Sequence, residues 1–309
     1  MTTVVEKALG LWGMPGATVR LIAARENRVF RVDHGGQSFA LRLHREGYRQ
    51  SQELWSELQW MAAVSAGGVH VPAPVASQAG QVLHTIDGTQ VDLLTWLTGQ
   101  PLGDALDQAT AAEQVTLFRR IGAEMAQLHV ISDAWERPDG FTRRHWDRAG
   151  LLGEKPLWGR FWDNPTLSRP DRAFFKDVRQ EADMRLRAVM ETLDYGLIHA
   201  DLVRENVLID AEQVQLIDFD DAGFGFRLFE LATLLLKTAD LAAHDELRAA
   251  LLAGYGDVRT IDSAPLDLFL LLRALTYVGW IAARLDEENA QDRNARYVET
   301  ARALALRVL

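Results

Sequence analysis

The segment from residue 197 to residue 221 is the part of the sequence that most constrains the fold. Two short runs rich in β-branched and other apolar residues, at 207–209 and 214–217, are separated by the polar residues 210–213. Short apolar runs that flank a polar turn are typical of paired antiparallel strands. The segment therefore predicts a compact β-hairpin whose flanking residues lie close together.

Three polar side chains stand at the edges of this predicted hairpin. Asp201 and Asn206, five residues apart, precede the first strand, and Asp218 follows the second. Phosphoryl transfer needs one carboxylate that orients the attacking hydroxyl and accepts its proton, and an amide and a second carboxylate that hold Mg²⁺ against nucleotide phosphates. The order and spacing match the kinase catalytic-loop pattern. A surface hairpin with incidental polar residues is the alternative, but three matches on predicted strands favour Asp201 as catalytic base and Asn206 and Asp218 as metal ligands.

The same segment resembles the aminoglycoside phosphotransferase-like family of the protein kinase-like superfamily. The resemblance rests on His-Ala-Asp-Leu at 199–202, Asn-Val-Leu at 206–208 and Ile-Asp-Phe-Asp at 217–220. Phe-Glu-Leu-Ala at 229–232 is similar to a further family signature, with Glu where Asp is usual. The superfamily also holds choline/ethanolamine kinases, a homoserine kinase type and a bacterial stress-response protein kinase.

The resemblance implies a reaction and its cofactors. It implies ATP- and Mg²⁺-dependent transfer of the γ-phosphoryl group to a hydroxyl of a small molecule of the aminoglycoside, amino alcohol, amino acid or sugar type. A Ser/Thr protein kinase of the stress-response type keeps the fold but changes the acceptor. A non-catalytic nucleotide-binding module is the third interpretation, which the intact Asp201, Asn206 and Asp218 disfavour.

The resemblance, together with the run of strands and helices, predicts an α+β, bilobal kinase-like fold. We expect residues 1–97 to form a lobe with a five-stranded antiparallel sheet and one helix at 52–64, after a short helix within residues 1–18. The expected strands are 19–22, 28–32, 38–43, 82–85 and 90–96. Residues 98–309 are expected to form a mostly helical lobe that holds the catalytic hairpin.

Arg42 is the predicted phosphate-binding cation of the first lobe. The resemblance places it where kinases carry a strand lysine, and its guanidinium keeps the charge and offers a fork suited to phosphate oxygens. An exposed strand arginine is the alternative. Glu53 and Glu57 lie one helical turn apart and are both candidates to pair with Arg42; we favour Glu57, because its sequence context resembles that of the family's helix glutamate.

The other nucleotide contacts are expected in two connecting segments. The turn at 24–27 contains no glycine, so Asn27 and backbone amides would cover the phosphates there. Residues 95–99 end the sheet and are expected to be the hinge, where the backbone of Thr95 and Leu97 would meet the adenine.

The predicted helical lobe holds several segments whose roles the sequence leaves open. Residues 138–170 are rich in tryptophan and arginine and form either a packing insert or the substrate wall. Residues 222–225 are expected to be a short flexible segment. Arg273, Tyr277 and Trp280 share one helical stripe, which either faces the substrate or, for the aromatic pair, packs in the core. His129 is expected to be a packed structural histidine.

Composition limits the partners and the compartment. The net charge of −10 argues against nucleic acid, whose phosphates call for a basic face. There are no cysteines, so disulfides and thiolate chemistry are excluded. Glu6 and Lys7 interrupt any leader-like apolar run, and Arg273 interrupts the most apolar stretch, so we expect a cytoplasmic protein without a membrane partner. The sequence does not determine the oligomeric state.

Overall fold

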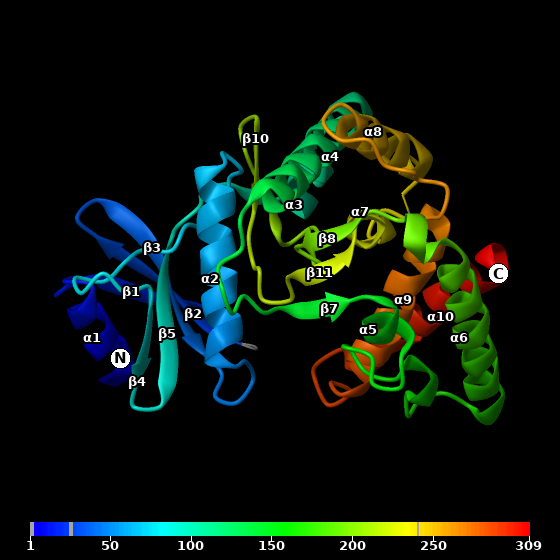
Figure 1. Ribbon diagram of the computed structural model, residues 1–309, viewed down its shortest axis with the longest axis horizontal. Helices are drawn as coiled ribbons and strands as arrows, with labels where there is room; N and C mark the ends of the chain where they lie inside the picture. Colours follow the sequence, from blue (N-terminus) through cyan, green and yellow to red (C-terminus); the bar gives the residue numbers. More distant parts are fainter. Residues whose placement is uncertain (1–2, 25–26, 240) are drawn as a thin grey trace. The chain divides into compact units, whose positions relative to one another are not determined.

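The computed structural model describes residues 3–24, 27–239 and 241–309, which fall into two compact units (Figure 1). The first unit contains the chain up to Leu102 together with Ala134–Arg143 and Val207–Asp220. The second contains Gly103–Asp133, Arg144–Asn206 and Asp221–Leu309. These units divide the chain at different places from the boundary expected between residues 97 and 98, which stays a prediction.

The first unit is built on a five-stranded antiparallel sheet with the strand order β1-β2-β3-β5-β4. Its strands are β1 (Thr18–Ala24), β2 (Asn27–His34), β3 (Gln37–His44), β4 (Leu83–Ile86) and β5 (Thr89–Thr95). Every run that the sequence predicts as a strand here overlaps one of them, and the runs 82–85 and 90–96 each extend one residue beyond the observed strand. The five-stranded sheet is therefore confirmed.

Helices cover the two faces of β3 differently. Helix α1 (Thr3–Leu11) contributes to a core cluster that also contains Leu41 and Leu43 of β3. Successive strand residues point to opposite faces of a sheet, so Arg42 points away from that cluster. Helix α2 (Ser51–Ala66) supplies the partner of Arg42 on that other face.

The predicted hairpin is present in the first unit. Strands β9 (Val207–Asp210) and β10 (Gln213–Leu216) pair in register across a two-residue turn, and β6 (Gln100–Pro101) lies on the other side of β9. Gly99 enters β6 with φ of 126°, and a Cβ there would lie 2.8 Å from the Ile209 carbonyl oxygen. Only glycine fits this close approach.

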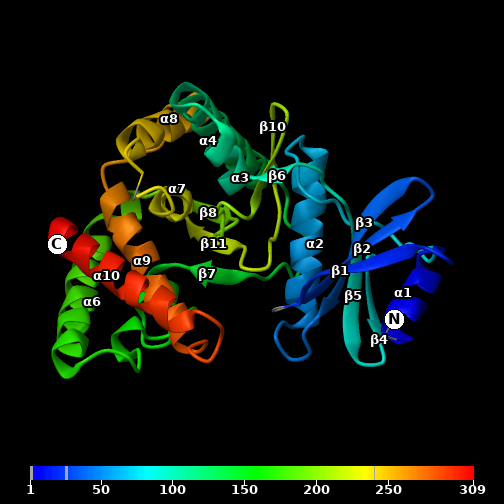
Figure 2. The same cartoon turned by 180° about the vertical axis from the view of Figure 1, so that it is seen from behind.

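The second unit is mostly helical, as predicted. Counted by where most of each element lies, its helices are α3 (Leu102–Gln108), α4 (Ala111–Ala134), α5 (Arg148–Leu152), α6 (Arg169–Val189), α7 (Arg227–Leu236), α8 (His244–Gly256), α9 (Leu266–Ala282) and α10 (Ala290–Val308), with short 3₁₀ turns at Phe161–Asp163 and Met190–Thr192. Figure 2 shows α10 lying along α9, the pair of helices with the most extensive mutual contact in this unit.

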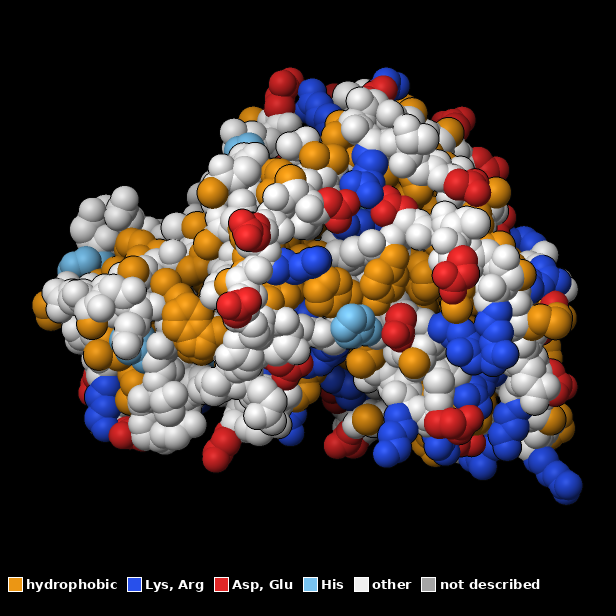
Figure 3. All heavy atoms as spheres, viewed as in Figure 1, with side chains coloured by type: hydrophobic (Ala, Val, Ile, Leu, Met, Phe, Trp, Pro, Cys, Tyr) orange, Lys and Arg blue, Asp and Glu red, His pale blue; other side chains and the backbone are white. Residues whose placement is uncertain are grey.

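Helix ends follow local capping chemistry. Thr110 and Glu113 form a capping box at the start of α4, with the Glu113 carboxylate accepting from the Thr110 N–H at 2.8 Å. Helix α6 begins at Arg169, because the Ser168 hydroxyl accepts from the Asp171 N–H and a proline occupies the first turn. Figure 3 shows basic and acidic side chains interspersed over α5 and α6, where the Arg148–Asp183 ion pair lies.

The expectation of a flexible segment at 222–225 is wrong. Gly223–Phe226 form β11, the central strand of a sheet with the order β7-β11-β8, where β7 is Arg144–Trp146 and β8 is Tyr195–Ile198. A Cβ on Gly223 would lie 2.3 Å from the Arg144 carbonyl oxygen. The glycines therefore permit close strand packing instead of providing flexibility.

The apolar stretch around Arg273 is the buried helix α9, as expected. Across the described ranges, no helix is both long and apolar enough to cross a membrane.

Candidate active site

The loop between β8 and β9 brings Asp201 and Asn206 together. The Asn206 side-chain amide donates from Nδ2 to the Asp201 carbonyl oxygen at 2.9 Å and lies 3.3 Å from Asp201 Oδ2. These contacts use the nitrogen of the amide, so the oxygen Oδ1 is the atom that remains to face a ligand. An amide oxygen is a ligand type that hard divalent cations such as Mg²⁺ accept.

Glu230 of α7 anchors the start of this loop. Its carboxylate accepts backbone N–H donors from His199 at 3.0 Å and from Ala200 at 2.6 Å. Ala200 has φ of 67°, a left-handed conformation that alanine rarely adopts. The glutamate thus holds the chain in a strained turn one residue before Asp201, as is common beside functional groups.

A buried chain of hydrogen bonds connects Glu230 to His129 and Tyr255. His129 Nε2 lies 3.3 Å from Glu230 Oε1, and His129 Nδ1 lies 2.8 Å from the Tyr255 hydroxyl. Burial, with Arg227 and Arg259 nearby, holds the pKa of His129 well below its usual range, so the ring is neutral. Donation from Nε2–H to Glu230 and from the tyrosine hydroxyl to Nδ1 satisfies all three groups. His129 is the structural histidine that the sequence predicts.

Glu230 makes the stability of the protein depend on pH. Burial raises the pKa of the Glu230 carboxyl from its ordinary value of 4.5 to about 7, although the hydrogen bonds from the two backbone N–H groups act to lower it. The folded state therefore binds more protons than the unfolded state between pH 4.5 and about 7, and the free energy of unfolding falls as pH rises through this window.

We expect Glu230→Gln to flatten this pH dependence. The fall in the free energy of unfolding across the window should shrink by at most roughly 3 kcal/mol. Urea denaturation at a series of pH values measures it. Glu246→Gln, at an exposed position in α8, is the matched control and should keep the wild-type slope. An unchanged slope in Glu230→Gln would contradict the assignment.

Arg273 of α9 contacts Asp201 directly. Its Nη2 donates to Asp201 Oδ1 at 2.5 Å and to the Tyr277 hydroxyl at 3.1 Å, and its Nη1 donates to the Ala200 carbonyl oxygen at 3.2 Å. The arginine side chain is fully buried, whereas 24% of the Asp201 side chain remains exposed. Burial raises the pKa of Asp201 to about 7, although Arg273 acts to lower it. A carboxylate with this pKa is suited to accept a proton near neutral pH.

In the first unit, Arg42 meets two carboxylates. Its Nε and Nη2 form a fork on Asp92, at 2.8 and 2.9 Å, and its Nη1 donates to Glu57 at 2.8 Å. The Arg42–Glu57 pair is the one that the sequence favours, and Asp92 is a partner that sequence reasoning missed. Burial alone would raise the pKa of Asp92, but Arg42 and His44 outweigh it and lower the pKa to about 2.

The exposed-strand alternative for Arg42 is wrong, since only 6% of the residue is exposed. Its expected contact with nucleotide phosphates stays a prediction.

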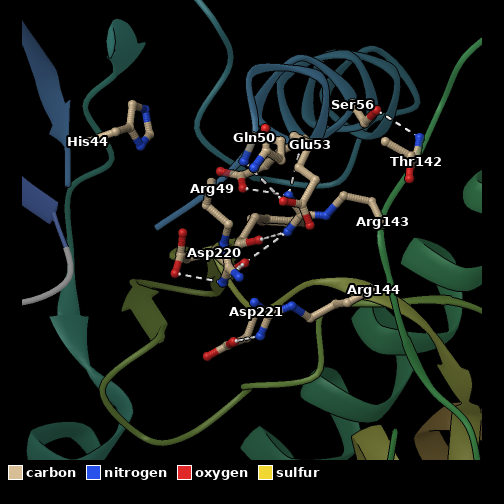
Figure 4. A network of polar contacts seen from close by, with 12 residues as sticks. His44, Arg49, Gln50, Glu53, Ser56, Thr142, Arg143, Arg144, Asp220 and Asp221 are labelled. Atoms are coloured by element: carbon tan, nitrogen blue, oxygen red, sulfur yellow. Dashed lines mark hydrogen bonds and ion pairs between the residues drawn. The ribbon is translucent and has the colours of Figure 1, made fainter. Parts of the chain in front are cut away.

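Arg143 joins this network to the segment that follows the hairpin (Figure 4). Its Nη1 donates to Glu57 at 3.0 Å, and its Nη2 donates to the carbonyl oxygens of Phe219 and Asp220, both at 2.9 Å. Arg49 also donates to the Asp220 carbonyl oxygen, at 2.8 Å. The two arginines therefore fix the backbone immediately after Asp218.

Asp218 itself has an unusual backbone. Its φ of 68° lies in the left-handed region, which few residues other than glycine adopt. Such an outlier persists only where its surroundings enforce it, and these positions cluster at functional sites. Asp218 belongs to the first unit, whereas Asp201 and Asn206 belong to the second.

Replacement of Glu57 tests the buried network. We expect Glu57→Gln to lower the free energy of unfolding by about 3–5 kcal/mol, because it removes a buried carboxylate that pairs with both Arg42 and Arg143 and leaves Asp92 as the remaining carboxylate partner of Arg42. Urea denaturation measures the change. Glu53→Gln, one turn earlier on α2, should cost about 1 kcal/mol, the value of the N-terminal contact that Glu53 makes with the Gln50 N–H. Equal losses in the two variants would contradict the central place of Glu57.

The remaining predicted contacts occupy the expected places in the first unit. Asn27 is the first residue of β2 and pairs with His44 of β3. Thr95 ends β5, and its hydroxyl accepts from the Ala73 N–H at 2.9 Å. Leu97 lies between β5 and β6. Residues 25 and 26 of the expected phosphate-covering turn lie outside the described residues. The nucleotide contacts of Asn27, Thr95 and Leu97 stay predictions.

The tryptophan-rich segment divides between packing and the surroundings of Asp201. Trp146, Phe161 and Trp162 are buried, as the packing interpretation expects. Trp158 is only partly buried, and the Arg273 guanidinium lies 4.4 Å from its ring centroid.

Metal binding was tested against the residues present. In the described part of the chain, no group of three or more His, Cys, Asp or Glu residues is placed to hold a metal ion. The predicted metal ligands, Asn206 and Asp218, do not form such a cluster, because the remaining ligands would be phosphate oxygens of a nucleotide. Its donors are all oxygens, which fits a hard cation.

Comparison with known proteins identifies the family. Residues 18–269 match the model of the phosphotransferase enzyme family, also called APH. The chain belongs to this family, as the resemblance of its motifs implies.

Two curated relatives cover most of their own length. The chain is 26% identical over 301 residues to an amicoumacin kinase of Bacillus subtilis (strain 168), spanning 92% of this chain and 85% of the relative. It is 27% identical over 248 residues to a homoserine kinase of Neisseria meningitidis serogroup B, spanning 77% of this chain and 73% of the relative.

Solved structures share the fold. A microcompartment-associated aminopropanol kinase superposes with a TM-score of 0.83 at 29% identity, covering 99% of this chain and 96% of that one. The amicoumacin kinase hAmiN superposes with a TM-score of 0.78 at 21% identity, covering 99% and 93%. The predicted α+β kinase-like fold is confirmed.

Proposed function

We propose that this protein transfers the γ-phosphoryl group of ATP to a hydroxyl of a small molecule, with Mg²⁺ as the metal. The single observation that carries the proposal is the loop at 199–206. In this loop, the Arg273 guanidinium donates a hydrogen bond to the Asp201 carboxylate, and the Asn206 side-chain amide donates one to the Asp201 carbonyl oxygen. The Glu230 carboxylate accepts from the backbone N–H of Ala200, the residue before Asp201. An asparagine five residues after the catalytic aspartate is the spacing of the kinase catalytic loop.

Each residue has a role in the proposal. Asp201 orients the acceptor hydroxyl and accepts its proton, while Asn206 and Asp218 hold the cation. When bound, the cation would neutralise the negative charge that develops on the phosphoryl group during its transfer. Arg42, positioned by Glu57, interacts with the nucleotide phosphates. Positioning and charge neutralisation suffice for this chemistry, so no covalent intermediate is needed.

The nucleotide contacts at Asn27, Thr95 and Leu97 complete the proposal. They rest on the places of Asn27 at the start of β2, Thr95 at the end of β5 and Leu97 just beyond β5. The structure of hAmiN, which is described as a complex with AMP-PNP and Ca²⁺, supports the use of a nucleotide and a divalent cation by this fold.

The relatives favour a small-molecule acceptor over a protein acceptor. Amicoumacin, homoserine and aminopropanol, the acceptors in their names, are all small molecules. The intact Asp201, Asn206 and Asp218 favour catalysis over a non-catalytic nucleotide-binding module. A cytoplasmic location and the absence of a nucleic-acid partner stay predictions.

Thermal denaturation with nucleotide and metal tests the nucleotide site. ATP with Mg²⁺ should raise the Tm of the wild type, because a ligand of the folded state stabilises it by mass action. The shift should require the metal and be lost in Asp218→Ala. Asp218→Asn is the second variant, since asparagine tolerates the left-handed backbone better than alanine does. No shift with ATP or GTP at millimolar concentration would overturn the proposal.

A further inference from the structure

Lys237 places a positive charge beside two tyrosine rings of the second unit. It follows α7 directly, and its ammonium lies 4.4 Å from the ring centroid of Tyr277 and 5.9 Å from that of Tyr297. The two rings are stacked, with centroids 5.0 Å apart. Within the described ranges, the Lys237 ammonium forms no ion pair. The side chain is partly exposed, so a ligand can reach it.

Contacts within the second unit connect this ammonium to Asp201. Lys237 lies over the Tyr277 ring, and the Tyr277 hydroxyl accepts from Arg273 at 3.1 Å. Arg273 in turn contacts Asp201 at 2.5 Å. The charge of Lys237 also acts to lower the pKa of Asp201. An acceptor whose hydroxyl reaches Asp201 would therefore lie in the part of the second unit that also holds Lys237.

The aromatic faces around Asp201 are already covered by cations of the chain itself. Arg273 lies 4.4 Å from the Trp158 centroid and 4.5 Å from the Tyr277 centroid, and Arg284 lies 4.3 Å from the Trp280 centroid. A ligand ammonium would have to displace these charges to reach a π face. The aromatic groups here therefore position the cations of the protein instead of offering a cage for a cationic ligand.

The Asp221 carboxylate is also neutralised. Asp221 forms an ion pair with Arg144 at 2.5 Å, and the Trp158 indole donates to it at 3.5 Å. Asp201 is paired with Arg273. Of the charged residues of this region named here, Lys237 is the one that forms no ion pair in the described part of the chain, and the Glu205 carboxylate acts on the nearby Tyr277 hydroxyl.

We propose that Lys237 binds an anionic group, a carboxylate or a phosphate, of the acceptor whose hydroxyl is phosphorylated. This inference rests on the proposed function and narrows its substrate class to hydroxy acids, hydroxy amino acids or hydroxylated phosphate esters. A lysine ammonium is a compact point charge that such a group can approach from several directions.

Matched acceptors that differ only in the anionic group test the inference. Serine is compared with ethanolamine, homoserine with 3-amino-1-propanol, and glycerate and glycerol 3-phosphate with glycerol, each with ATP and Mg²⁺ and with ADP release as readout. The glycerol series separates a carboxylate from a phosphate. We expect kcat/KM to be higher for an anionic member than for its matched partner.

Substitution of Lys237 provides the second readout. We expect Lys237→Met to lower the ratio of kcat/KM between the anionic and the matched acceptor by roughly 10- to 100-fold, mainly through KM, as loss of a charged hydrogen bond predicts. Lys237→Arg should retain most of the ratio. Lys176→Met, at an exposed lysine of α6, is the control and should leave the ratio unchanged.

The outcomes separate this inference from the proposed function. Phosphorylation of the acceptors without an anionic group in preference to the anionic ones would overturn it, as would a Lys237→Met variant with an unchanged ratio. Nucleotide binding without turnover of any anionic acceptor would overturn it as well, while leaving the nucleotide site intact. Failure of the wild type to bind ATP in the presence of Mg²⁺ would instead overturn the proposed function on which the inference rests.

Discussion

Asp201→Asn is expected to lower kcat for phosphoryl transfer by roughly 10²- to 10⁴-fold, the contribution of a positioned general base. Asparagine keeps the shape of the side chain but cannot accept the proton of the acceptor hydroxyl. The Tm shift caused by ATP with Mg²⁺ should persist, because Asp201 is not among the proposed metal ligands. Rates of ADP release with a saturating acceptor measure the effect.

Two further observations sharpen this test. Burial raises the pKa of Asp201 to about 7, so the kcat/KM of the wild type should fall as pH decreases below about 7, where the base becomes protonated. Glu205→Gln, which neutralises an exposed carboxylate of the same loop, is the matched control and should keep kcat within a few-fold. A kcat for Asp201→Asn within tenfold of the wild type would show that Asp201 is not the base.

The hairpin and its flanking residues could be predicted because their signal is local. Strand runs, the polar turn and the positions of Asp201, Asn206 and Asp218 all lie within 25 residues of one another. The chain geometry of a hairpin then determines where each residue stands. The Arg42–Glu57 pair could be predicted for a similar reason, since only a strand, a turn and the start of a helix separate the two residues.

The partners that the sequence did not reveal come from distant parts of the chain. Asp92 is 50 residues from Arg42, and Arg143 is 86 residues from Glu57. Asp92 nevertheless carried a usable signal, because it interrupts the apolar run of β5 and a fully buried carboxylate requires a partner. What the sequence could not supply was the identity of that partner, which tertiary packing decides.

Strand β11 shows a different limit. Its glycines predict flexibility when considered alone, and only the neighbouring strands β7 and β8 explain why side chains are excluded. Backbone hydrogen bonds to both neighbours then fix the segment. The glycine content of this segment therefore gave a wrong prediction, because close packing of the main chain, and not side-chain burial, determines the structure of β11.

Arg273 carried the same kind of signal as Asp92, and its position now supports a stronger prediction. An arginine in the most apolar helix of the chain must be paired, and its partners are the Asp201 carboxylate and the Ala200 carbonyl oxygen. Cation–π contacts with Trp158, Tyr277 and Phe229 surround the same guanidinium. The residue thus fixes one oxygen of Asp201, while Oδ2 faces the Asn206 amide.

We expect Arg273→Met to lower the free energy of unfolding by about 3–5 kcal/mol, because it leaves a largely buried carboxylate without its partner. It should also lower kcat more than it raises the KM for ATP, since Arg273 acts on the orientation of Asp201. Urea denaturation and steady-state kinetics measure the two effects. Arg273→Lys keeps the charge but not the fork, so both losses should be intermediate.

The double variant Asp201→Asn with Arg273→Met separates positioning of Asp201 from general packing. If Arg273 acts through Asp201, the second substitution should add little to the loss of kcat caused by the first, and the two stability losses should not add. Fully additive effects on kcat would instead mean that Arg273 supports the helix and not the base. Its two contacts with the loop, one to the carboxylate and one to the preceding carbonyl oxygen, favour the non-additive result.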